Sequence, residues 1–181
     1  ALEVNLSCPN VKAGCMSIGS DPVQVKTIVS ELRKRTSLPL WIKLTPNVTD
    51  IKTVALAAQE GGADAVVLIN TLLGMAIDIR TRRPILRNNT GGYSGPAVKP
   101  VALRMVSECS QVLNIPIIGC GGISCADDVL EFMIAGASAV EIGTASLVHP
   151  TCPVDITKDL HKWCEDNDTK LSDLTGTLQL W

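Results

Sequence analysis

The chain has 181 residues, of which 46 % are hydrophobic and 19 % are charged, so it can bury a core and is not disordered. Its net charge is −2 without a basic run, and no apolar stretch reaches the roughly 18 residues of a membrane span, which argues against nucleic-acid and membrane partners. Its 7 cysteines form no Cys-x-x-Cys pair and only 2 histidines accompany them, so we predict reduced thiols in a cytoplasmic protein without a metal site.

Short apolar runs alternate with amphipathic stretches along the chain. The runs predict strands over residues 2–6, 38–44, 65–69, 115–119 and 139–142. Because these runs are apolar on both faces, they are typical of a parallel sheet that is covered by helices.

The amphipathic stretches between the runs predict helices. Apolar residues follow the i, i+3, i+4, i+7 spacing from Val25, Ile51 and Leu130, and a last helix is predicted over residues 154–164. The helix start signals are Asp21 before a proline, Thr49 as a cap, and Ser124 with Asp127 at the spacing of a capping box.

One unit of sequence occurs twice. The unit begins at Leu38 and again at Ile115. In each copy a hydrophobic residue and a proline are followed by a strand, a helix cap, a helix and a Gly-Ala-x-Ala-Val run. Repeated strand–helix units predict an α/β fold, either a (β/α)8 TIM barrel or a doubly wound sheet. Polar or glycine residues follow all the predicted strands, and a barrel would direct them to one mouth. No Gly-x-Gly-x-x-Gly follows a strand, so the barrel is favoured, with residues 1–181 as a single domain.

Glycine-rich turns predict a phosphate-bearing ligand. Gly121 and Gly122 follow one predicted strand, Gly143 and Thr144 follow the next, and Gly95 lies near the end of the longest connection, residues 71–99. Glycines at strand-to-helix turns let backbone N–H groups approach a phosphate, and barrels often use the loops after their last two strands in this way. The alternative is that these glycines only make tight turns.

Three polar side chains stand beside apolar strands. Lys43 lies within an apolar run, where a lysine is costly unless it is paired or faces a ligand, although a lysine that extends to solvent is the alternative. Asn70 ends a strand and is either a ligand for a planar polar molecule or part of a simple turn. Cys8, also at a strand end, is either a base or nucleophile or a structural thiol.

Six motifs together resemble the catalytic subunit of class 1B dihydroorotate dehydrogenases. In chain order they are NLSCPN (residues 5–10), KLTPN (43–47), INT (69–71), GGYSGPAVK (91–99), GCGGI (119–123) and GTA (143–145). The resemblance implies an FMN-containing barrel that oxidises dihydroorotate to orotate in pyrimidine synthesis. It also implies that the chain supplies about the last five strand–helix units of the barrel, with about three more before Ala1.

The resemblance also assigns roles to residues and implies partners. Cys8 would be the catalytic base, and the substrate would be held by Asn5, Asn70 and Thr71. FMN would be bound by Asn5, Lys43, Ile69, Gly95, Gly121, Gly122, Gly143 and Thr144. Class 1B members pass electrons to NAD through a partner subunit that holds FAD and a [2Fe–2S] cluster, and we also expect a homo-oligomer.

Two alternatives remain open. The pyrimidine-reducing domain of dihydropyrimidine dehydrogenase has similar motifs, and its catalytic cysteine lies further along the first loop, where this chain has Cys15. Asn10 and the run INTLLGM (residues 69–75) favour dihydroorotate. The other alternative is an inactive partial barrel that only packs with another chain.

Overall fold

The computed structural model describes residues 1–7 and 15–181. Five parallel strands form one sheet whose spatial order is the order of the chain: β1 (Leu2–Asn5), β2 (Leu40–Lys43), β3 (Ala65–Leu68), β8 (Ile117–Cys120) and β9 (Ala139–Glu141). The five predicted strands are confirmed, each within two residues at either end. The sequential order differs from that of a doubly wound sheet, so it favours the barrel.

The sheet is strongly curved. The Lys43 side chain on β2 contacts both Glu3 on β1 and Glu141 on β9. In a flat sheet, β2 and β9 would lie three strand spacings of about 4.8 Å apart, with their side chains perpendicular to the sheet. These side chains can meet only because the sheet bends toward the face that carries them, as the wall of a barrel does.

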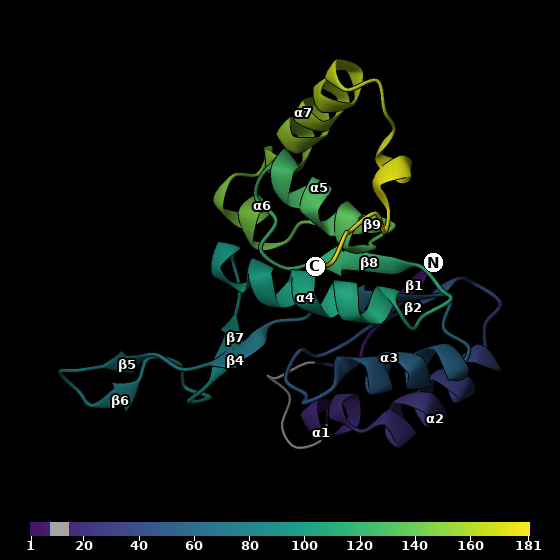
Figure 1. Ribbon diagram of the computed structural model, residues 1–181. Coiled ribbons are helices and arrows are strands. Elements are labelled where there is room, and N and C mark those ends of the chain that lie inside the picture. The colour runs from purple at the N-terminus through teal and green to yellow at the C-terminus, as the bar shows by residue number, and fades with distance from the viewer. Residues whose placement is uncertain (8–14) are drawn as a thin grey trace.

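The helices are α1 (Cys15–Ser20), α2 (Pro22–Arg33), α3 (Ile51–Glu60), α4 (Lys99–Ser110), α5 (Ala126–Ala135), α6 (Thr144–Val148) and α7 (Cys152–Asp166), with short 3₁₀ turns η1 (Pro96–Val98) and η2 (Leu171–Leu174). Buried residues of α2, α3, α4, α5 and α7 form the main core with the other, convex face of the sheet. Helices α2 and α3 lie side by side (Figure 1). Leu40, Ile42, Val66 and Phe132 are among the fully buried residues of this core. A smaller cluster, Ala65, Val67 and Ile118, lies apart from it and packs against Trp41 and Cys120.

The cap of α2 is the predicted one, but the cap of α3 is not. Asp21 caps α2 by accepting a hydrogen bond from the Val23 N–H at 2.9 Å. Helix α3 is capped by Asp50 rather than by Thr49, and Asp50 Oδ1 accepts a hydrogen bond from the Lys52 N–H at 3.1 Å. A carboxylate is a stronger acceptor for these N–H groups than a hydroxyl.

The predicted capping box of α5 is displaced by one residue. Cys125 is the N-cap, and the carboxylate that turns back to it belongs to Asp128 rather than to Asp127. Asp128 Oδ2 accepts hydrogen bonds from the N–H groups of Ser124 at 2.7 Å and Cys125 at 3.1 Å. The buried position of Asp128 explains the choice, because its charge must be matched by donors, whereas Asp127 is exposed to water.

The long connection after β3 is an arm made of two antiparallel ribbons. In the first, β4 (Leu72–Gly74) pairs with β7 (Gly91–Tyr93), and in the second, β5 (Ile77–Asp78) pairs with β6 (Arg83–Pro84). The arm projects from the body of the molecule (Figure 1). Its base, next to Gly95, reaches the carboxyl ends of the parallel strands.

Candidate functional site

A cavity of about 430 Å³ lies at the carboxyl ends of β2, β3, β8 and β9, beside the base of the arm. Nine of the predicted site residues line it: Lys43, Ile69, Asn70, Thr71, Gly95, Gly121, Gly122, Gly143 and Thr144. Asn5 does not line the cavity but is hydrogen-bonded to Asn70. Cys8 lies outside the described residues, so its role stays a prediction. The sequence therefore identified residues that the fold brings to one place.

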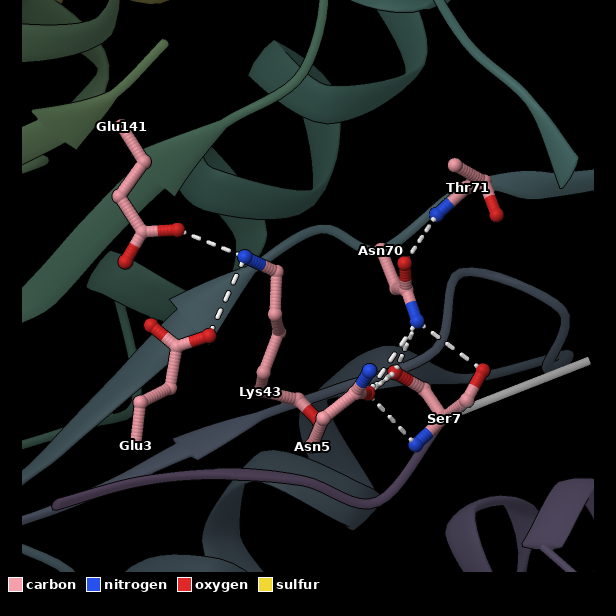
Figure 2. Close-up of polar contacts among 7 residues, drawn as sticks. All are labelled: Glu3, Asn5, Ser7, Lys43, Asn70, Thr71 and Glu141. Carbon is pink, nitrogen blue, oxygen red and sulfur yellow. Dashed lines mark hydrogen bonds and ion pairs between the residues drawn. The ribbon is translucent and has the colours of Figure 1, made fainter. Parts of the chain in front are cut away.

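Asn70 connects the end of β3 to the end of β1 (Figure 2). Its Nδ2 donates to Ser7 Oγ at 2.6 Å, to the Ser7 carbonyl at 3.0 Å and to Asn5 Oδ1 at 3.2 Å. Its Oδ1 accepts a hydrogen bond from the Thr71 N–H at 2.9 Å. Asn70 is therefore more than part of a simple turn, because these bonds fix the plane and direction of its amide at the cavity wall.

Asn5 has a supporting position behind Asn70. Its Oδ1 also accepts hydrogen bonds from the Ser7 N–H at 3.0 Å and from Ser7 Oγ at 2.7 Å. Ser7 is buried, with 2 % of its surface exposed, and was not predicted as a site residue. Its place between Asn5 and Cys8 in the NLSCPN motif was the available signal.

Lys43 is paired with two acidic side chains that were not predicted (Figure 2). Its Nζ lies 2.6 Å from Glu141 Oε2 and 3.3 Å from Glu3 Oε1, and its side chain is 16 % exposed. Burial would lower the pKa of Lys43, but the hydrogen bond to Glu141 and the nearby negative charges outweigh it and raise the pKa. Lys43 is therefore an ammonium in the cavity wall, and the alternative of a lysine extended to solvent is wrong.

The two carboxyl groups beside Lys43 differ in acidity. Burial and a hydrogen bond to Glu141 raise the pKa of Glu3. Burial acts in the same direction on Glu141, but its hydrogen bonds to Glu3 and Lys43 outweigh burial and lower its pKa. Glu141 is therefore the firmly ionised partner of Lys43, and Glu141 also lines the cavity.

The glycine turns at the cavity have two different causes. Gly122 has a φ of +79°, and a Cβ there would lie 2.8 Å from the Lys99 nitrogen and 3.0 Å from the Gly95 oxygen, so the fold itself requires glycine. At Gly143 a Cβ would meet nothing within 4 Å. The tight-turn alternative therefore explains Gly122, whereas Gly143 leaves open space beside the cavity.

Hydrogen bonds join the arm to the rest of the site. Thr144 Oγ1 donates to Ser94 Oγ at 2.8 Å, which links the start of α6 to the base of the arm. Asn47 Nδ2 donates to the Thr71 carbonyl at 3.1 Å, and Asn47 Oδ1 accepts from the Leu73 N–H at 2.9 Å. Asn47 is the last residue of the KLTPN motif, and no separate role was predicted for it.

Two features are absent from the described part of the chain, residues 1–7 and 15–181. In it, no group of three or more His, Cys, Asp or Glu side chains could hold a metal ion. No helix within those ranges is long and apolar enough to cross a membrane.

Comparisons with known proteins agree on one family. A family model described as dihydroorotate dehydrogenase matches residues 1–163. The "Dihydroorotate dehydrogenase B (NAD(+)), catalytic subunit" of Pelobacter propionicus is 51 % identical over 179 residues, which cover 98 % of this chain and 59 % of that protein. The protein of the same name from Geotalea daltonii is 52 % identical over 180 residues, 99 % of this chain and 59 % of that protein. This chain thus spans less than two thirds of the length of these relatives.

A solved structure shows the same likeness. The crystal structure of the DHODH of Eimeria tenella in complex with ferulenol superposes with a TM-score of 0.78 at 27 % sequence identity. The match covers 97 % of this chain and 53 % of that one. The α/β fold predicted from the sequence is therefore confirmed.

Proposed function

This chain belongs to the dihydroorotate dehydrogenase family, and we propose that it carries a large part of the site at which such an enzyme oxidises dihydroorotate to orotate in pyrimidine synthesis. The observation that carries the proposal is the cavity that gathers Lys43, Asn70, Thr71 and the glycine turns. These residues come from separate motifs of the sequence, and only the fold brings them together.

The cavity fits FMN at both ends of that molecule. The open space beside Gly143, where a Cβ would meet nothing within 4 Å, leaves room for a phosphate against the backbone. The ammonium of Lys43, which also lines the cavity, would lie beside the ring. When bound, FMN supplies a hydride acceptor. The positive charge of Lys43 would stabilise the negative charge that reduction adds.

The polar residues at the ends of β1 and β3 suit a flat, hydrogen-bonding substrate. Asn70 is held rigidly by Ser7 and Asn5, so a substrate that displaces one of these bonds meets an amide already in place. Thr71 follows it at the cavity wall. We assign the proton transfer to Cys8, whose Sγ would take a proton from a ring carbon of dihydroorotate. Proton transfer by a positioned group contributes roughly 10²–10⁴-fold to a rate.

A partner subunit is part of the proposal. The name of the relatives, "Dihydroorotate dehydrogenase B (NAD(+)), catalytic subunit", describes those proteins as one subunit of an enzyme that uses NAD⁺. By analogy, we propose that electrons leave this chain through a subunit with FAD and a [2Fe–2S] cluster. A homo-oligomer and a cytoplasmic location stay predictions from the sequence.

The test is reduction of the bound flavin by substrate. The purified natural protein, with its partner chains, is mixed without oxygen with dihydroorotate or with dihydrouracil, and the visible flavin absorbance is followed. We expect dihydroorotate, but not dihydrouracil, to bleach the flavin absorbance. Bleaching by dihydrouracil instead would support the dihydropyrimidine dehydrogenase alternative, and a colourless protein would support the inactive partial barrel.

A further inference from the structure

The position of the Lys43 ammonium depends on side chains from two other strands. Glu141 on β9 and Glu3 on β1 contact its Nζ at 2.6 Å and 3.3 Å (Figure 2). The flexible four-carbon side chain of a lysine loses considerable conformational entropy when it is held in one place. An ammonium with a fixed position therefore needs groups that bind it. Glu141 supplies the shorter contact and, unlike Glu3, lines the cavity itself.

The carboxylates also change the charge that the cavity wall presents. A buried ammonium without a partner would present one full positive charge to the cavity. The anion of Glu141, with a pKa lowered by its hydrogen bonds to Glu3 and Lys43 although burial opposes this, cancels part of that field. Glu3 contributes less, because its pKa is raised by burial and by its hydrogen bond to Glu141.

We propose that Glu141, supported by Glu3, is a positioning residue that fixes the Lys43 ammonium at the cavity wall and holds down the reduction potential of a flavin bound there. The proposal rests on the flavin site proposed above. Reduction adds negative charge to a flavin, so any negative group close to Lys43 makes reduction less favourable. The ion pair of Glu141 and Lys43 would thus set how readily the flavin takes electrons from the substrate and passes them on.

The experiment compares Glu141→Gln with the parent protein. Glutamine keeps the length and an acceptor oxygen for Lys43 but removes the charge. In the variant, we expect the affinity for reduced flavin to increase about tenfold relative to the affinity for oxidised flavin, which is about the effect of one charge–charge interaction. For a two-electron couple, this change corresponds to a rise of about 30 mV in the reduction potential. Glu141→Asp keeps the charge and should stay near the parent value, whereas Glu3→Gln should produce a smaller rise.

A charge removed elsewhere and a flavin-free measurement serve as controls. Glu131→Gln removes the same charge from the exposed partner of Lys99, outside the cavity, and should leave the potential unchanged. In flavin-free protein, acylation of Lys43 is measured by mass spectrometry against exposed Lys34. It should become about tenfold faster in Glu141→Gln, because loss of the neighbouring negative charge lowers the pKa of Lys43.

The outcomes separate this proposal from the one on which it rests. An unchanged potential in a Glu141→Gln protein that binds flavin and is reduced by dihydroorotate overturns the tuning role alone. Unchanged acylation of Lys43 overturns the positioning role. If the parent protein binds no flavin, the proposed function fails and the tuning role falls with it, whatever the acylation shows.

Discussion

The ion pair between Lys99 and Asp128 should be a main source of stability for the walls of the cavity. Asp128 Oδ1 accepts a hydrogen bond from Lys99 Nζ at 2.6 Å, and its Oδ2 accepts from the Ser124 and Cys125 N–H groups at the start of α5. Lys99 begins α4, so the pair joins the helix that follows the arm to the helix that follows the Gly121–Gly122 turn. We expect Asp128→Asn to remove the charge while it keeps an acceptor for Ser124.

The magnitude follows from the pKa of Asp128. Burial would raise this pKa, but the hydrogen bonds from Lys99 and Ser124 outweigh burial and lower it from 3.8 to about 2. At about 1.36 kcal/mol per pKa unit, the difference between the two pKa values corresponds to about 2.4 kcal/mol of stability. Solvent screening reduces this contribution little, because the Asp128 side chain is only 9 % exposed. Because the folded pKa lies below the unfolded one, this stability is present above about pH 4 and is lost as the pH falls through about 2.

Urea unfolding, followed by tryptophan fluorescence, measures this contribution. At about pH 7, Asp128→Asn should lower the free energy of unfolding by about 2 kcal/mol, and the gap to the parent should narrow below about pH 4. Asp127→Asn is the matched control, since Asp127 is exposed in the same helical turn and should change stability by less than about 0.5 kcal/mol. If the Asp128→Asn variant is as stable as the parent at neutral pH, or if the gap is independent of pH, the ion pair does not have this role.

Three further predictions concern the site. Cys8→Ser should slow dihydroorotate-driven flavin reduction in stopped-flow by roughly 10²–10⁴-fold and Cys15→Ser should not; the reverse result would move the base to Cys15. Lys43→Met should lower the flavin potential or weaken FMN binding in a protein that stays folded, and a normal flavin in a protein with a sharply lower melting temperature would contradict this. Gly143→Ala should weaken FMN binding without loss of stability, whereas Gly122→Ala should cost about 1–3 kcal/mol in urea unfolding; equal stability losses would argue against a ligand-binding role for Gly143.

The strands were predictable because a parallel strand covered on both faces is a short apolar run. All four residues of β3 are buried, and the sequence shows them as an uninterrupted apolar stretch. The ribbons of the arm were not predicted, since Pro84, Gly91 and Gly92 are residues that strands usually avoid. There, pairing with a neighbouring strand overrides local preference.

The site was predictable where a motif kept its residues close together in the sequence. Asn70 and Thr71 were found in this way, and so were the glycine turns. Glu3 and Glu141 were missed because their role depends on contacts between strands, and no local pattern carries that information. Glu3 lies on β1, the strand that pairs with β2, whereas Glu141 on β9 reaches Lys43 only because the sheet is curved. Each nevertheless is an acid within an apolar run, the same signal that singled out Lys43.

A crystal structure of the natural protein grown with FMN and orotate would show most directly whether this cavity is the site of dihydroorotate oxidation. We expect the flavin phosphate at the glycine turns beside Gly143, the ring against Lys43, and orotate on Asn70 and Thr71. Flavin bound at another place, or orotate away from Asn70 while the cavity stays empty, would contradict the function proposed for the cavity.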